Sequence, residues 1–394
     1  MRVSVSIPVP IPEEDTVKGR LFKRLASVVL FPLILLLAAC QSSGPAVGAN
    51  PIRIGVIVPL TSGVSSAAQS VVNGAQLAAD EISGEKGIQG RRLKLVILDD
   101  HGNAQEAVRL VEQLAGEEVV GIIGPVTDAT TIAAAGAAER FQVALISPGA
   151  TATLPYGGHF LFRTALPART QAAAIASYLV ENLGIRTIAV AHDSNEYGTM
   201  VARAFEESVK ARGATVTSRR LYRDGDTDFS RHVHGVLAER ARALFLAGYP
   251  DEGTLLLRQM RALHPRLIIA GSDALYSDDT LAWGGSAADG LYAPASFVAD
   301  TTLPIVKNFV TKYRQRFGRV PDHFAAQAYD AVRLLAQATR AAGPDRRKAR
   351  DALAAIRRFP GVTGELSFDR WGEVARDVTI VRVKGGVFVP TGRP

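Results

Sequence analysis

The alternation of short apolar runs with helical segments most strongly limits how this chain can fold. Ile52–Val58 is a β-branched run that ends at Pro59, which is typical of a buried strand. The apolar residues between Val71 and Ile82 are spaced for one face of a helix, and another apolar run follows at 93–98. Repeated strand–helix alternation of this kind predicts a parallel sheet with helices on both of its faces.

The same pattern restarts in the middle of the chain. A new apolar run begins at 187–191, and others at 243–247 and 267–270 are separated by helical segments. A length of 394 residues is also typical of a chain with about two domains. We therefore predict an α/β chain of two doubly wound lobes.

The first forty residues predict an export signal. Four basic residues between 18 and 24 precede a short apolar stretch at 25–39, as in a secretory signal. The Leu-Ala-Ala-Cys sequence at 37–40 resembles a bacterial lipobox, in which the cysteine is lipidated and becomes the first residue. We expect a signal peptide at 1–39, lipidation of Cys40 and a tether at 40–50, made mostly of small and polar residues. The alternative is a plain signal or anchor in which the cysteine falls by chance.

The composition excludes several classes of protein. Hydrophobic residues make up 47% and charged residues 21%, which argues against disorder and against a polytopic membrane protein. The net charge is +7, but no basic run exceeds 346–348, so we expect no nucleic-acid partner. A single cysteine excludes an internal disulfide and a cysteine-rich metal site.

The sequence carries no enzyme signature. It lacks a G-x-S-x-G elbow, a P-loop and a G-x-G-x-x-G turn placed after a strand. Its seven histidines are scattered, and His232 and His234 have no downstream pair at metal-ligand spacing. We expect neither an enzyme nor a resident metal or cofactor.

Candidate binding residues follow the predicted strands, where ligands of open α/β sheets bind. In the first half, the segments 124–131 and 147–153 combine helix starts with hydroxyl groups, which suits an anion or a carboxylate. The alternative for each is an ordinary helix cap. In the second half, the segments 192–198, 248–252 and 271–274 carry aromatic or acidic residues. Together these segments predict one cleft lined from both lobes, in which tyrosine packs on an apolar ligand and Asp273 pairs with an ammonium group.

Six segments of the chain resemble the leucine/isoleucine/valine-binding family of periplasmic proteins, which serve ABC importers. They are RIGVIVPLTSG at 53–63, NGAQLAADEI at 73–82, GIQGRRLKLVILDD at 87–100, VVGIIGPVTDATT at 119–131, ALISPGATATLP at 144–155 and RTIAVAHDSNEYGTM at 186–200. The resemblance covers 53–383. Their order and spacing are specific for the family but not for a ligand.

The resemblance implies two Rossmann-like lobes with parallel sheets, joined by three hinge crossovers. We expect the crossovers near 163–166, 289–292 and 361–366. The N-terminal lobe then comprises 51–164 plus 291–362. The C-terminal lobe comprises 165–290 plus 363–394.

The resemblance also assigns roles to residues. The Thr151 hydroxyl and N–H would donate to a ligand carboxylate, and the Gly149 carbonyl would accept from an ammonium group. Tyr197 and Tyr249 stand at aromatic positions, and Asp273 stands where an acid pairs with the ammonium. The predicted ligand-binding set is Thr127, Asp128, Gly149, Ala150, Thr151, Tyr197, Tyr249 and Asp273.

Two positions depart from the family pattern. Asp128 stands where the family usually has a serine that binds the ligand carboxylate, and two anions would repel. Either Asp128 is turned away as a cap, or Thr127 takes the role, or the ligand is not an α-amino acid. Ala67 and Ala68 stand where an aromatic lid is usual, which leaves room for a larger ligand or for none.

Two functions therefore remain open. The first is a monomeric, extracytoplasmic, membrane-anchored lipoprotein that captures an amino acid or a small amide for an ABC permease. Capture would work by hinge closure, because the ligand contacts both lobes only in the closed state. The second is an interaction lipoprotein on the same fold, such as an activator of peptidoglycan synthases.

Overall fold

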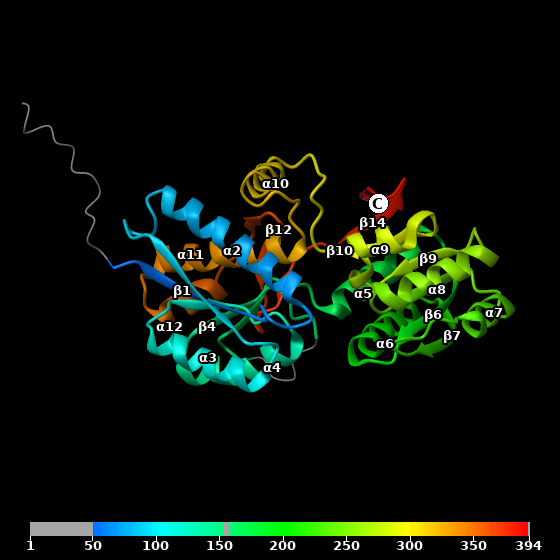
Figure 1. The fold of residues 1–394 in the computed structure, drawn as a ribbon, viewed down its shortest axis with the longest axis horizontal. Coiled ribbons are helices and arrows are strands. Elements are labelled where there is room, and N and C mark those ends of the chain that lie inside the picture. The colour runs from blue at the N-terminus through cyan, green and yellow to red at the C-terminus, as the bar shows by residue number, and fades with distance from the viewer. Residues whose placement is uncertain (1–49, 153–157, 393–394) are drawn as a thin grey trace, which may run out of the picture. The chain divides into compact units, whose positions relative to one another are not determined.

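The structure is a computed structural model that describes residues 50–152 and 158–392 (Figure 1). Residues from Asn50 onward form one compact unit. The predicted signal peptide and Cys40 lie outside the described residues. In the described ranges, no helix is both long enough and apolar enough to cross a membrane.

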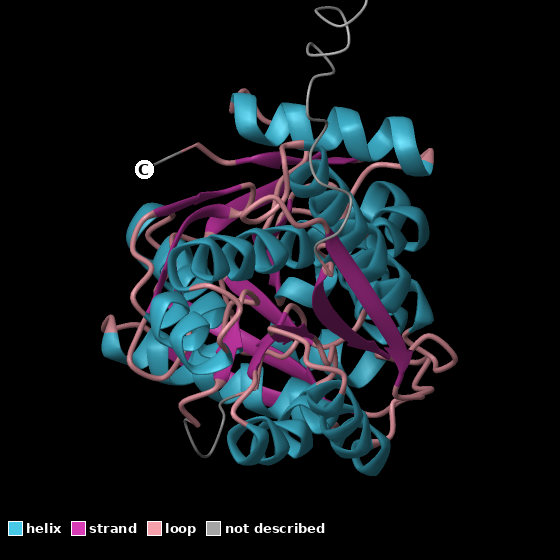
Figure 2. Ribbon diagram, turned by 90° about the vertical axis from the view of Figure 1, so that its left-hand side faces the viewer, coloured by secondary structure: helices cyan, strands magenta, loops and turns pink. Residues whose placement is uncertain are grey.

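The first lobe is built on a five-stranded parallel sheet in the order β2-β1-β3-β4-β5. Its buried residues form one core on each face, so helices cover both sides of the strands (Figure 2). The strands are β1 (Ile52–Val58), β2 (Leu93–Asp99), β3 (Gly121–Ile123), β4 (Ala144–Ser147) and β5 (Leu161–Arg163). Helices α2 (Ser65–Gly84), α10 (Pro304–Phe317), α11 (His323–Ala342) and α12 (Arg346–Ala354) supply one core, and α3 (Ala104–Gly116) and α4 (Asp128–Phe141) supply the other.

A close approach of α2 and α11 depends on one glycine. A β-carbon built on Gly74 would lie 2.0 Å from the backbone oxygen of Ala325, which no side chain could tolerate. The glycine therefore lets two 20-residue helices pack with their backbones in contact. The NGAQ motif of the sequence thus has a packing role.

The second lobe is built on a seven-stranded sheet in the order β15-β14-β10-β9-β8-β6-β7. Its first five strands in the chain are parallel, and the last two join antiparallel. The strands are β6 (Thr187–Asp193), β7 (Thr215–Tyr222), β8 (Ala243–Ala247), β9 (Ile268–Gly271), β10 (Leu291–Ala295), β14 (Thr379–Lys384) and β15 (Val387–Pro390). Helices α5 (Ala168–Ser177) and α6 (Glu196–Ala211) pack on one face, and α7 (Ser230–Ala238), α8 (Pro250–Leu263) and α9 (Asp278–Gly284) lie on the other side.

The two parallel-sheet lobes confirm the predicted fold class. Two of the expected lobe boundaries differ from the structure. Strand β10 was expected in the first lobe, but it pairs with β9 and β14 of the second sheet. Residues 363–375 were expected in the second lobe, but β12 (Gly364–Phe368) and β13 (Val374–Ala375) pack into the first core. The short strand β11 (Phe359–Gly361) pairs with β12.

One half-buried arginine links the three crossovers. The chain passes between the lobes at 164–167, 296–303 and 376–378. Arg376 lies on the third crossover, and its guanidinium donates to the backbone oxygens of Thr164 on the first crossover and Ser296 on the second. It also donates to the backbone oxygen of Thr363, in the turn between β11 and β12. Burial lowers the pKa of Arg376 to about 10, against the opposing effect of Asp330.

Asp330 of α11 fixes the turn between β11 and β12. Its buried carboxylate accepts hydrogen bonds from the N–H groups of Val362 and Thr363, each at 2.9 Å, and from the Thr363 hydroxyl at 2.7 Å. A buried carboxylate is stable only when it is paired and hydrogen-bonded. Asp330 and Arg376 both form hydrogen bonds with Thr363, so together they fix this turn.

Candidate functional site

The first half of the candidate site lies where β3 and β4 end side by side. The Thr127 hydroxyl caps α4 by accepting from the N–H of Thr130 at 3.3 Å. Asp128, the next residue, reaches across to the loop after β4. Its Oδ1 accepts hydrogen bonds from the N–H groups of Thr151 at 2.7 Å and Ala152 at 2.9 Å. The loop's free donors are thus bound to a carboxylate of the chain itself.

This arrangement bears on the alternatives for Asp128. Thr127, and not Asp128, is the helix cap, so the carboxylate is not turned away for that purpose. The Thr151 N–H, which the family resemblance assigned to a ligand carboxylate, already has an acceptor. A ligand carboxylate could reach this N–H only by displacing Asp128.

Hydrogen bonds of Ser147 fix the start of the loop after β4. The buried Ser147 hydroxyl donates to the Pro125 carbonyl at 2.7 Å and accepts from the Ala150 N–H at 3.1 Å. The Ala150 side chain is fully buried, so only its backbone can face a ligand. At Gly149 a β-carbon would lie 2.3 Å from the Val126 oxygen, so the loop needs glycine there.

The second half of the site brings three predicted residues into contact. The Tyr197 hydroxyl donates to Oδ1 of Asp273 at 2.6 Å. The rings of Tyr197 and Tyr249 stack with centroids 5.0 Å apart. Tyr197 is half-buried, whereas Tyr249 is 43% exposed and offers its ring to a ligand. The structure therefore unites an aromatic surface with a carboxylate at the carboxyl ends of β6, β8 and β9.

The phenol groups of both tyrosines stay protonated at neutral pH. Burial raises the pKa of Tyr249 to about 12, and the charges of Asp128 and Asp273 act in the same direction. Burial, followed by the charge of Asp273, raises the pKa of Tyr197. Asp128 from the first lobe and Asp273 from the second thus both raise the pKa of the Tyr249 phenol.

One further residue of this site was not predicted. Gln171 of α5 donates from Nε2 to Oδ2 of Asp273 at 3.0 Å and fixes its orientation. Gln171 does not follow a strand, so a search for polar residues at the ends of strands, which found Asp273, gave no signal for it.

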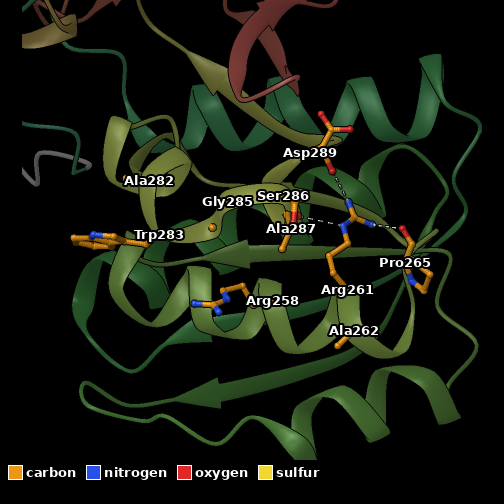
Figure 3. A pocket seen from close by; sticks show the side chains of 11 residues that line it. Arg258, Arg261, Ala262, Pro265, Ala282, Trp283, Gly285, Ser286, Ala287 and Asp289 are labelled. Carbon is orange, nitrogen blue, oxygen red and sulfur yellow. Dashed lines mark hydrogen bonds between the residues drawn. The ribbon is translucent and has the colours of Figure 1, made fainter.

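Two surface hollows are lined by other residues of the second lobe. One, of 730 Å³, is lined by residues of α8 and α9 and lies near the amino ends of β9 and β10 (Figure 3). There Arg261 donates to the backbone oxygens of Pro265, Leu267, Ala287 and Asp289, so it clamps the local backbone. The other, of 520 Å³, runs along α6. Neither is lined by a predicted ligand-binding residue.

Comparison with known proteins identifies the class that this fold and site define. Residues 51–387 match the model of the periplasmic binding protein family. The chain is 30% identical over 329 residues to the Leu/Ile/Val-binding protein BraC3 of Rhizobium johnstonii, covering 82% of this chain and 89% of that protein. It is 28% identical to a leucine-, isoleucine-, valine-, threonine- and alanine-binding protein of Pseudomonas aeruginosa, over 83% of this chain and 88% of that one.

Solved structures agree with this assignment. The branched-chain amino-acid binding protein LivJ of Streptococcus pneumoniae, in complex with isoleucine, is 28% identical with a TM-score of 0.76. That match covers 86% of this chain and 97% of that one. A substrate-binding protein of Desulfitobacterium hafniense in complex with Leu is 26% identical, with a TM-score of 0.76, over 87% of this chain and all of that one. The chain belongs to the periplasmic binding protein family, which consists of binding proteins and not of enzymes.

Proposed function

We propose that this protein captures a small solute outside the cytoplasm and delivers it to an ABC importer. The solute would be an amino acid of the branched-chain type or a small amide. The observation that carries the proposal is the contact of Tyr249, Tyr197 and Asp273, which sets an exposed ring beside an oriented carboxylate. The relatives that bind leucine, isoleucine or valine support the same solute class.

Each half of the site has a part in capture. Asp273, held by Tyr197 and Gln171, pairs with the amino group of the solute. The Tyr249 ring covers its apolar body, and the backbone at 149–151 contacts its other end. A solute that contacts both lobes only when they close shifts the population toward the closed state. Arg376, which links the three connections, keeps the hinge together during this motion.

Asp128 favours the amide within this solute class. Its carboxylate already holds the Thr151 and Ala152 N–H groups, and it would repel a second carboxylate. An amide carries no charge, and its NH₂ group can donate to the remaining lone pairs of Asp128. The chain is therefore suited to a solute whose carboxyl group is amidated.

The proposal extends to the location of the protein. Membership of the family points to a place outside the cytoplasm. We propose that Cys40 is lipidated and that 40–50 tethers a monomeric binding unit to the membrane, beside its permease. The matching test is metabolic labelling with a fatty-acid analogue. We expect incorporation into the wild-type chain and none into a Cys40→Ala variant.

A thermal-shift screen of the Asn50–Pro394 unit tests the solute class. A solute that binds only the folded state raises the unfolding temperature by mass action. We expect a concentration-dependent rise with a branched-chain amino acid or its amide, and loss of that rise in Asp273→Asn and Tyr249→Ala variants. A protein shown to be solute-free that responds to none of them contradicts the proposal. Binding to an isolated peptidoglycan synthase instead would favour the interaction lipoprotein.

A further inference from the structure

We propose that Asp193, Asp224 and Glu252, here called the tricarboxylate cluster, form a binding site for a hard divalent cation of the calcium type. The cluster belongs to the second lobe and shares no residue with the proposed solute site. One carboxylate oxygen from each of the three residues lies within 4.8 Å of the other two. Ca²⁺ binds oxygens at about 2.3–2.6 Å, so two oxygens on opposite sides of one ion are about 5 Å apart. The spacing of the three oxygens therefore fits a shared ion.

The fold explains why these three residues meet. Asp193 is the last residue of β6, Asp224 follows the end of β7 by two residues, and Glu252 lies in the first turn of α8, after β8. The three strands are neighbours in the order β8-β6-β7. The carboxyl ends of parallel neighbours reach the same edge of the sheet, so the acidic side chains after them converge.

The charge of the cluster is not balanced by the protein. Among the described residues, no side-chain nitrogen of a lysine, arginine or histidine lies within 4.0 Å of an oxygen of these three carboxylates. Asp193 is fully buried. Its pKa is raised by burial and further by the charges of Asp224 and Glu252. A bound cation would remove this repulsion.

A second observation, independent of the carboxylates, points to a ligand. Tyr222 is 1% exposed, and its hydroxyl has no hydrogen-bond partner among the described residues. Buried polar groups nearly always have a partner, including water or an ion. After burial, the charges that most raise the pKa of this phenol are those of Asp193, Glu252 and Asp224.

The direction of the Tyr222 hydroxyl follows from what packs on Gly248. A β-carbon built there would lie 2.0 Å from this hydroxyl and 3.3 Å from the β-carbon of Asp193. The Tyr222 hydroxyl and the Asp193 side chain therefore both lie against Gly248. The hydroxyl can accept a hydrogen bond from a water molecule bound to the cation.

The existing hydrogen bonds leave oxygens for an ion and position them. Asp193 accepts from the N–H and the side-chain amide of Asn195, and Glu252 Oε1 accepts from the Gly225 N–H at 2.8 Å. Such bonds orient the carboxylates that ligate a metal. Asp224 takes part in none of the side-chain hydrogen bonds of the described residues, so both of its oxygens are available. Three carboxylates completed by water suit the modest affinity of extracellular calcium modules, with Kd of about 10⁻⁴–10⁻³ M.

Calorimetric titration of Ca²⁺ into the purified full-length chain, after treatment with a chelator, tests the proposal. We expect one saturable site and a rise in unfolding temperature with Ca²⁺. Asp224→Asn and Glu252→Gln should each weaken binding by at least about tenfold, since each removes a charged ligand. Asp224 is exposed, so its variant is expected to fold. Asp279→Asn, which removes an exposed charge from α9, is the matched control and should bind as the wild type does.

Three results would overturn the cation site. The first is the absence of saturable binding of Ca²⁺ or Mg²⁺ to the wild-type chain. The second is binding that Asp224→Asn leaves unchanged, which would place the ion elsewhere. The third is a wild-type chain that ignores Ca²⁺ but loses affinity for an amine solute in Asp224→Asn, which would assign the charges to the solute. Solute capture is measured separately, so failure of one proposal leaves the other intact.

Discussion

Replacement of Asp128 by serine tests how the first lobe selects its solute. In the wild-type chain, one carboxylate oxygen accepts both the Thr151 and Ala152 N–H groups. Hydrogen bonds to a charged group contribute about 1.5–3 kcal/mol each. Asp128→Ser frees these two donors and removes the repulsion. If an isoleucine carboxylate regains the equivalent of one such bond, its affinity rises by about 10- to 100-fold.

The assay compares isoleucine with isoleucinamide by calorimetry in three proteins. The amide lacks the charge, so we expect Asp128→Ser to change its affinity much less. Asp128→Asn is the matched control, because its side-chain oxygen can still accept from both N–H groups while the charge is lost. It should give an intermediate gain for isoleucine. If both variants leave the ratio of the two affinities unchanged, Asp128 does not select the solute.

Three further perturbations test the scaffold. Gly74→Ala should lower the free energy of unfolding by about 1–3 kcal/mol, because the added methyl group clashes with α11. Gly136→Ala, at a helix position with no neighbour within 4 Å, is the control and should not lower it. Urea unfolding measures both variants. Asp330→Ala should lower the free energy of unfolding by about 3–5 kcal/mol, because it leaves the buried N–H groups of Val362 and Thr363 and the Thr363 hydroxyl without their acceptor. Asp330→Asn, which keeps an acceptor oxygen, should cost less, and an equal loss would contradict the role of charge. Burial, and then the charge of Arg219, lower the pKa of His192 in the folded chain below its ordinary value of 6.5. As the pH drops below 6.5, the unfolded chain therefore binds this proton before the folded chain does. The free energy of unfolding should fall over this pH range. His192→Gln should flatten that pH dependence of the urea midpoint, and an unchanged slope would contradict it.

The sequence predicted those parts of the fold that depend on local patterns. The β-branched run at Ile52–Val58 forms β1, as expected, because its burial on both faces leaves a continuous apolar signature. The strand-end rule likewise located Tyr197, Tyr249 and Asp273, which the structure brings into contact. Such residues can be predicted because the carboxyl ends of parallel strands lie at the same edge of the sheet.

Features that depend on long-range pairing could not be predicted. Strand β10 belongs to the second sheet because it pairs with β9 and with β14, whose residue Val381 pairs with Ala293 far along the chain. The contact between Asp128 and Thr151 spans 23 residues and depends on the neighbouring ends of β3 and β4. The tricarboxylate cluster likewise joins three separate loops. No local sequence pattern indicates which of these residues are in contact.

Calorimetric titration of the solute-free Asn50–Pro394 unit with isoleucine and isoleucinamide tests the central claim most directly. The claim is that the contact of Tyr249, Tyr197 and Asp273 captures the amino end of a branched-chain solute. We predict saturable one-to-one binding of at least one of the two, lost in Asp273→Asn and retained in Asp279→Asn. A folded, solute-free protein that binds neither compound, or that binds one equally well after Asp273→Asn, would contradict this account.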